Sequence, residues 1–315
     1  MQEILYIIVP CYNEEEVLED SSKKLLDVLN QMIDCKLISN ESKIVFVNDG
    51  SKDRTWEIIS NLTQKDEKFK GVSLSHNRGH QNALLAGYTY SVDKADMMIT
   101  IDADIQDDIN VMKDFVNNYY AGCDVVYGVR TSRKKDSFFK RSTAQGFYKF
   151  MKRMGVEVVY NHADYRLTSK KATKAILEFD ESNLFLRGIV PLIGFKSAKV
   201  GYERSKRLAG KSKYPLRKML SFAWDGITSF STKPLNMLLT FGFLFTFIGI
   251  GFDIYFLVDY FISNNIVRHP LLVILFSMLF SLGVILLGIG LVGQYVGKTY
   301  IETKKRPRFF IDETK

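Results

Sequence analysis

The fold is decided by residues 97–107, which read MMITIDADIQD. The uncharged run Met97 to Ile101 is typical of a short buried strand. Asp102 and Asp104 follow it, so two carboxylates stand one residue apart where such a strand reaches solvent. In open α/β sheets, ligands bind outside the carboxyl ends of the strands. Paired carboxylates at that place suit a Mg²⁺ or Mn²⁺ ion that bridges to phosphate oxygens.

The same pattern recurs along the first half of the chain. Residues 5–9, 43–47, 72–74 and 124–127 are predicted to be short buried strands. Helical patterns follow the first two of them, over residues 14–32 and 53–62. Because strands alternate with helices, the sequence predicts an α/β domain with a mostly parallel sheet covered on both faces.

Two long apolar segments follow in the second half. Residues 271–292 carry no charge and would extend about 33 Å as a helix, enough to cross a hydrocarbon core of about 30 Å. A second run, 237–258, is interrupted only by Asp253, and a short connection joins the two runs into a predicted transmembrane hairpin. Basic residues flank the hairpin on both outer sides, whereas the connection offers only Arg268, so both flanks are expected in the cytoplasm.

These patterns predict four parts of the chain. They are a domain over residues 1–213, an amphipathic helix over 214–233, the hairpin over 234–297 and a basic cytoplasmic tail over 298–315. The spacing in 214–232 fits a helix at the bilayer interface and a core-packing helix equally well. The first residues lack the features of a secretory signal, which predicts that the domain stays in the cytosol.

The net charge of +8 comes largely from two segments. Residues 130–153 and 196–218 each carry nine Lys or Arg against a single acidic residue. Beside a predicted hairpin, such clusters favour anionic lipid over nucleic acid as the partner, with a solvated basic face as the alternative. We therefore expect a membrane-bound protein that does not bind nucleic acid.

Polar clusters follow four of the predicted strands. They read PCYNE at residues 10–14, NDGSKDRT at 48–55, HNRGH at 76–80 and DADIQD at 102–107. All four are expected at one edge of the sheet. An aromatic ring and carboxylates can hold a base and a ribose, while Arg78 and a metal ion can hold a diphosphate. The clusters together predict a site for a nucleotide diphosphate.

The motifs at residues 9–14, 48–53 and 102–104 resemble the family 2 glycosyltransferases, which have a GT-A fold. With the hairpin, the chain looks like the polyprenyl-phosphate glycosyltransferases, bacterial relatives of dolichol-phosphate mannose synthase that include the GtrB and CsbB types. Further marks are residues 106–107, 128–130, 164–167 and 210–214. The resemblance covers essentially the whole chain. It implies a cytosolic GT-A domain, an interfacial helix and a two-helix hairpin in the bacterial inner membrane.

The resemblance also implies roles for individual residues. The nucleotide sugar would be bound by Pro10, Tyr12, Glu14, Asp49, Arg78 and Asp102, and Mg²⁺ or Mn²⁺ by Asp102, Asp104 and Gln106. Candidates for the acceptor phosphate are Arg130, Arg133, Arg166, Arg207, Lys211 and Lys213, because guanidinium and ammonium groups recognise phosphate oxygens. The catalytic set is expected to be Asp102, Asp104, Asp164 and Arg130.

Asp164 has three interpretations. It occupies the position of a candidate base in relatives, it could orient the sugar or pair with Arg166, or it could form a purely structural ion pair. A strong base is not required, because a phosphate group with a second pKa near 6 is largely a dianion at neutral pH.

The implied activity is inverting transfer of a sugar, from UDP-glucose or UDP-N-acetylglucosamine, to undecaprenyl phosphate at the cytoplasmic leaflet. The lipid-linked sugar would serve cell-envelope glycan modification, with a flippase and a second glycosyltransferase acting later. Small residues in the hairpin favour a homo-oligomer, with a tetramer as one form. The alternatives are a processive polysaccharide synthase, disfavoured because neither Trp56 nor Trp224 lies in a Gln-x-x-Arg-Trp motif, and a non-catalytic scaffold that binds nucleotide sugars.

Overall fold

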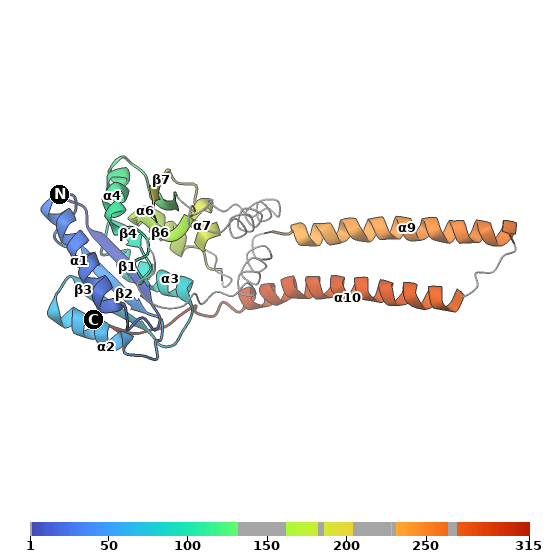
Figure 1. The fold of residues 1–315 in the computed structure, drawn as a ribbon, viewed down its shortest axis with the longest axis horizontal. Coiled ribbons are helices and arrows are strands. Elements are labelled where there is room, and N and C mark those ends of the chain that lie inside the picture. The colour runs from blue at the N-terminus through green and yellow to red at the C-terminus, as the bar shows by residue number, and fades with distance from the viewer. Residues whose placement is uncertain (1, 132–161, 182–185, 204–227, 229–230, 264–269) are drawn as a thin grey trace. The chain divides into compact units, whose positions relative to one another are not determined.

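The structure is a computed structural model that describes residues 2–131, 162–181, 186–203, 228, 231–263 and 270–315 (Figure 1). The described residues fall into two compact units. The first holds the strands and the shorter helices together with Arg306–Lys315, and the second holds the two long helices that precede Arg306.

The first unit is built on one eight-stranded sheet with the strand order β7-β5-β6-β4-β1-β2-β3-β8. Its centre confirms the expected parallel arrangement, since β1 pairs in parallel with β2 and β4, and β2 pairs in parallel with β3. These strands are β1 (Leu5–Cys11), β2 (Lys43–Asn48), β3 (Phe69–Leu74) and β4 (Met97–Thr100). Their carboxyl ends therefore meet at one edge.

On the side of β4 away from β1, the sheet continues with three strands, one of which is antiparallel to its neighbours. The strand β6 (His162–Ser169) is antiparallel both to β4 and to β5 (Val125–Arg130), while β7 (Ser197–Tyr202) is parallel to β5. The amino end of β6 consequently lies at the same edge as the carboxyl ends of β4 and β5. This topology brings Asp164 to the edge where Asp102 lies.

Helices cover both faces of the sheet. Successive side chains of a strand point to opposite faces, so a strand that is apolar throughout contributes to a core on each face. Leu5, Ile7 and Val9 of β1 pack in one core, whereas Tyr6 and Ile8 pack in the other. The first core is covered by α1 (Leu18–Asp34), α2 (Thr55–Lys65) and α4 (Met112–Tyr120), which follows the short helix η1 (Ile109–Val111). The second is covered by α3 (His80–Ser91), α6 (Lys170–Leu177) and α7 (Leu186–Leu192).

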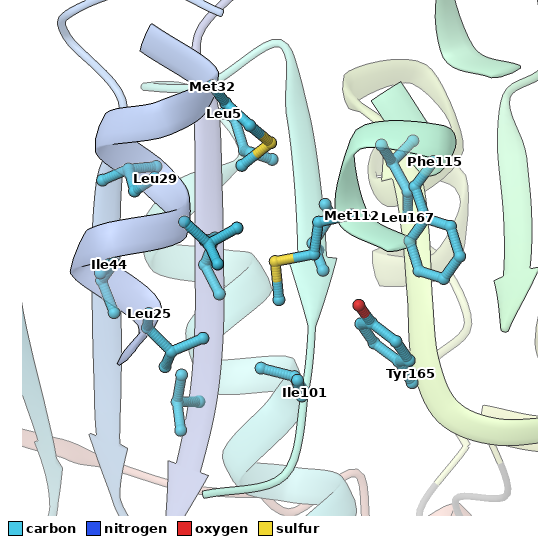
Figure 2. Packing of buried hydrophobic residues seen from close by; sticks show 14 of the residues in the cluster. Leu5, Leu25, Leu29, Met32, Ile44, Ile101, Met112, Phe115, Tyr165 and Leu167 are labelled. Atoms are coloured by element: carbon cyan, nitrogen blue, oxygen red, sulfur yellow. The ribbon is translucent and has the colours of Figure 1, made fainter. Parts of the chain in front are cut away.

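Figure 2 shows the first core from close by. Leu25, Leu29 and Met32 of α1 are buried against the strands, and the ring of Phe115 of α4 packs on Tyr165 of β6 with a centroid distance of 4.8 Å and a tilt of 48°. Burying side chains of this size removes about 1.5–3 kcal/mol of unfavourable hydration each. The packed layers hold the strand ends at the site edge in fixed positions.

The strand β8 (Ile311–Thr314) completes the sheet at its outer edge. It pairs antiparallel with β3, and the backbones of Gly71 and Lys315 exchange hydrogen bonds of 2.9 and 2.8 Å. Trp56 Nε1 of α2 donates to Glu313 Oε2 at 3.1 Å. The segment 298–315, expected to be a basic tail, therefore contains the end of a helix and an edge strand of the first unit.

The second unit contains α9 (Lys233–Ser263) and α10 (Pro270–Thr303). Ser281–Thr303 of α10 is the one helical stretch among the described residues that is long and apolar enough to cross a membrane. The sequence placed the second span over 271–292, so the two ranges overlap in part. Most of the expected helix over 214–233 lies outside the described residues.

Candidate active site

The loops that follow β1 and β2 are joined by hydrogen bonds at the carboxyl edge of the sheet. The backbone N–H of Asn13 donates to Ser51 Oγ at 3.1 Å, and the N–H of Lys52 donates to Asn13 Oδ1 at 2.9 Å. The N–H of Glu14 donates to Thr55 Oγ1 at 2.9 Å. These reciprocal contacts fix two of the sequence motifs side by side.

Asp49 joins the second of these loops to the one after β3. Its side chain is buried, and its two oxygens accept from the backbone N–H groups of Arg78 at 2.7 Å and Gly79 at 2.9 Å. Burial raises the pKa of Asp49, and these two hydrogen bonds only partly oppose the increase. The next residue, Gly50, has a φ of 61°, and a Cβ there would lie 2.5 Å from the Asn77 backbone nitrogen, so no larger residue fits.

Of the groups expected around the nucleotide, Pro10 lies in β1, Tyr12 follows that strand, and Arg78 lies in the loop after β3. Tyr12 is 40% exposed, as a ring available for stacking on a base would be, while Pro10 is buried in β1. The Arg78 Nε is buried, with no hydrogen-bond partner among the described residues. A buried guanidinium N–H of this kind needs an acceptor, and a phosphate oxygen is a suitable one.

The residues after β4 form a tight turn that carries the candidate metal ligands. The N–H of Ile105 donates to Asp102 O at 3.2 Å, and Ile105 has a φ of 42°, in the left-handed region. Ser21 Oγ of α1 donates to the Ala103 carbonyl at 2.6 Å and holds the turn against the domain. Among the described residues no group of three or more His, Cys, Asp or Glu side chains has metal-binding geometry.

The electrostatics of this turn nevertheless suit a cation. Partial burial raises the pKa of Asp102, and the nearby carboxylates Asp164, Asp107 and Asp104 raise it further against the opposing charge of His80. Crowded carboxylates of this kind are stabilised by a divalent cation. Carboxylate and amide oxygens, the donor types of Asp102, Asp104 and Gln106, are those that Mg²⁺ and Mn²⁺ prefer, and these ions need few protein ligands when phosphates and water complete the shell.

His80, the first residue of α3, lies between two of the acidic side chains. Its Nε2 is 3.7 Å from Asp102 Oδ1 and 3.6 Å from Asp164 Oδ2. Burial lowers the pKa of His80, but the polar contact with Asp164 and the charges of both carboxylates outweigh burial and raise it. His80 therefore links the turn after β4 to the start of β6.

Asp164 is held by two guanidinium groups. Arg166 Nη2 donates to Asp164 Oδ1 at 2.6 Å, and Arg187 of α7 donates to Oδ2 at 3.0 Å through Nη2 and to Oδ1 at 3.4 Å through Nε. Burial would raise the pKa of Asp164, but Arg187, His80 and Arg166 together hold it well below its usual value. The side chain of Arg166 is 1% exposed and that of Arg187 is 36% exposed.

Arg130, at the carboxyl end of β5, is also paired. Its Nη2 lies 3.5 Å from Asp107 Oδ1, and its Nε donates to the Tyr202 hydroxyl at 3.3 Å. Burial lowers the pKa of Arg130, and the charge of Asp107 outweighs that effect and raises it. The structure thus places Arg130 at the site edge, within reach of the residues that follow β4.

Four expected acceptor-phosphate residues lie outside the described residues: Arg133, Arg207, Lys211 and Lys213. Two further residues in the cluster received no role from the sequence. His80 belongs to the HNRGH motif and could have been found from its place at a strand end. Arg187 follows no strand, so the sequence pattern gave no signal for it.

With this geometry in place, the class of protein follows from its sequence family. Residues 6–177 match the model of glycosyl transferase family 2, and the chain belongs to that family. Its first unit has the GT-A type of α/β fold that the motifs predicted.

Relatives align over nearly the whole chain. The uncharacterized glycosyltransferase YkoT of Bacillus subtilis is 48% identical over 99% of this chain and 92% of its own length. The bactoprenol glucosyl transferase of Shigella phage SfX is 36% identical, over 98% of this chain and 99% of its own. Among solved structures, glucosyl-3-phosphoglycerate synthase from Mycobacterium tuberculosis aligns with a TM-score of 0.46 at 15% identity, over 72% of this chain and 79% of its own.

Proposed function

We propose that this glycosyltransferase moves a sugar from a nucleotide donor to undecaprenyl phosphate at the cytoplasmic leaflet of a bacterial inner membrane. One observation carries the proposal. The nucleotide-binding motifs, the acidic turn after β4 and the paired arginines meet at one sheet edge, in a chain that aligns end to end with relatives named bactoprenol glucosyl transferase. Glucose or N-acetylglucosamine linked to UDP is the proposed donor.

The membrane part of the proposal is supported by the surface of the long helices. Large apolar side chains on α9 and α10 are exposed, among them Phe243 at 65%, Phe247 at 70% and Leu287 at 75%. A soluble surface rarely exposes so many apolar side chains together, whereas lipid covers them without cost. We infer a two-helix transmembrane hairpin whose flanks lie in the cytoplasm, within a homo-oligomer.

In the proposed reaction the acceptor phosphate oxygen attacks the anomeric carbon from the side opposite the nucleotide diphosphate. The bond from that carbon to the diphosphate breaks, and the configuration inverts. Asp102, Asp104 and Gln106 would hold Mg²⁺ or Mn²⁺, which neutralises charge on the departing diphosphate. Tyr12, Arg78 and the loop braced by Asp49 bind and orient the donor.

The test uses the purified full-length chain in detergent with radiolabelled UDP-glucose or UDP-N-acetylglucosamine, undecaprenyl phosphate and Mg²⁺ or Mn²⁺. We expect a chloroform-soluble product that carries one sugar, no product with excess chelator, and loss of activity in Asp104→Ala. Asp93→Asn is the matched control, because the Asp93 side chain is 81% exposed in a surface ion pair.

Other outcomes identify the alternatives. A ladder of long products on a gel would identify a processive synthase. Tight, metal-independent nucleotide binding without turnover would identify a scaffold. Failure of every common UDP- and GDP-linked sugar to give a lipid product would overturn the proposal.

A further inference from the structure

Arg187 and Asp164 form a two-point charged contact at the site edge. Both oxygens of Asp164 accept from the Arg187 guanidinium, at 3.0 and 3.4 Å, which fixes the plane of that group. The start of α7 is itself anchored, because the backbone N–H of Leu186 donates to Gln81 Oε1 of α3 at 2.7 Å. The position of Arg187 is therefore set both through its side chain and through its helix.

The two arginines that hold Asp164 differ in accessibility. Arg166 lies in β6 with its side chain 1% exposed, so a lipid phosphate has no access to it in this structure. Arg187 has a side chain that is 36% exposed. The phosphate-binding role expected for Arg166 thus fits the position of Arg187 better, while Arg166 supports Asp164 from the interior of the sheet.

Arg187 is also connected to the acidic turn after β4. From Arg187 the contacts run to Asp164, then to His80 at 3.6 Å, and from His80 to Asp102 at 3.7 Å. A guanidinium carries five N–H donors in a planar fork, so the same group can donate to a carboxylate and to a phosphate oxygen at the same time. Arg187 therefore has the chemistry and the location to contact a phosphate oxygen beside the proposed donor site.

We propose that Arg187 binds a phosphate group during the transfer and that Asp164 is a positioning residue that orients its guanidinium. This inference rests on the proposed function. The phosphate belongs either to the donor diphosphate or to the lipid acceptor, since both present the same oxygens to a guanidinium. In this proposal Asp164 orients Arg187 and does not act as a base, which agrees with the hydrogen bonds that its two oxygens accept from two arginines.

Kinetics of the full-length chain test the role of Arg187. Rates for Arg187→Gln and Arg187→Lys are measured against UDP-glucose concentration and against undecaprenyl phosphate concentration, and the binding of UDP alone is measured by calorimetry. We expect Arg187→Gln to lower kcat/KM by about 100-fold, the scale of one lost charged contact in a transition state, with a smaller loss in Arg187→Lys.

The two sources of phosphate give different results. A raised KM for UDP-glucose with weaker UDP binding assigns Arg187 to the donor diphosphate. A raised KM for undecaprenyl phosphate with unchanged UDP binding assigns it to the acceptor. The control is Lys174→Gln, an exposed cation near the carboxyl end of α6 paired with Asp93, which should behave as the unaltered chain does. If the kcat/KM of Arg187→Gln lies within twofold of that of the unaltered chain, the inference is overturned.

A double-mutant cycle tests the positioning role of Asp164. If Asp164 acts through Arg187, then Asp164→Asn raises the same KM as Arg187→Gln, and the double variant is no worse than the poorer single variant. If Asp164 removes a proton, then Asp164→Asn lowers kcat with both KM values unchanged, which overturns that part of the inference. Should Asp164→Asn fail to fold, Asp164→Glu takes its place in the cycle.

The two proposals fail in distinguishable ways. An unaltered chain that makes no lipid-linked product contradicts the proposed function itself. An unaltered chain that makes the product, together with an equally active Arg187→Gln, contradicts only the role of Arg187.

Discussion

At the residue scale, Asp49 shows how a motif residue can act through the backbone. The sequence placed it around the nucleoside, and the structure shows both carboxylate oxygens accepting from the loop that carries Arg78. In the proposed function, Asp49 therefore acts on donor binding through the loop that it fixes. This is the type of contact that a motif alone does not distinguish from a direct one.

Replacing Asp49 with Asn is expected to destabilise the protein and to lower the rate of sugar transfer. An Asn side chain offers one acceptor oxygen, so its amide N–H would face a backbone N–H and leave that buried donor without a partner. The expected loss is about 1–3 kcal/mol of folding free energy. Thermal unfolding of the full-length chain in detergent, together with the transfer rate, measures both effects.

Asp93→Asn provides the comparison, because Asp93 is exposed. Its folding free energy is expected to change by no more than about 0.5 kcal/mol. Equal melting temperatures for Asp49→Asn and Asp93→Asn would contradict the structural role assigned to Asp49.

The site residues differ in how far the sequence could reveal them. Asp102, Asp104 and Asp49 could be proposed from the sequence because they follow apolar runs that are readily recognised as strands. The contact between Asp164 and Arg187 was not found, because it depends on an antiparallel strand and a separate helix that meet only in the folded chain. The HNRGH motif was noticed, but the place of His80 between two carboxylates required the structure.

At the scale of elements, the sequence predicted the parallel strands well and missed the strands that depend on pairing. β1, β2 and β4 are buried and carry continuous apolar runs, which makes them recognisable, whereas β3 reads FKGVSL and was recognised only over residues 72–74. β6 contains a buried arginine that is paired with Asp164, so its sequence lacks the usual apolar pattern. β8 reads IDET and is exposed, so only its pairing with β3 identifies it as a strand.

Deleting residues 311–315 is expected to destabilise the first unit. The deletion removes the backbone pairing between Gly71 and Lys315 and the Trp56 contact with Glu313, and it leaves β3 as an unprotected edge. We expect a lower melting temperature and a greater tendency to aggregate, measured by thermal unfolding and light scattering of the full-length chain and of the deletion variant in detergent.

Asp312→Ala is the matched control for this deletion, since Asp312 lies exposed in the same strand. A deletion variant that melts and scatters light as the control does would show that β8 adds nothing to the stability of the sheet.

At the scale of the whole molecule, the chain joins a GT-A unit to two long apolar helices that follow it in sequence. The helices themselves were predictable from the apolar runs over 237–258 and 271–292. α10 continues through Thr303, and its candidate membrane stretch, Ser281–Thr303, overlaps the predicted span over 271–292.

A charge placed in the middle of α10 is expected to impair membrane insertion. Leu287 lies in both the predicted span and Ser281–Thr303, and its side chain is 75% exposed. Leu287→Arg should cost about 2.5–3.5 kcal/mol on insertion, which lowers the amount of protein that resists carbonate extraction from membranes. Thr303→Arg, at the end of the helix, should remain in the membrane fraction.

Extraction of the unaltered chain by carbonate, or equal retention of Leu287→Arg and Thr303→Arg, would contradict a transmembrane α10.

The position of β8 in the chain has a consequence for biosynthesis. Its residues are translated after α9 and α10, yet they pair with β3, which is translated long before them. The sheet of the glycosyltransferase unit therefore stays one strand short while the ribosome makes both apolar helices. A nascent chain that stalls within those helices would carry an open sheet edge, so complete folding of this unit reports that the helices have already been synthesised.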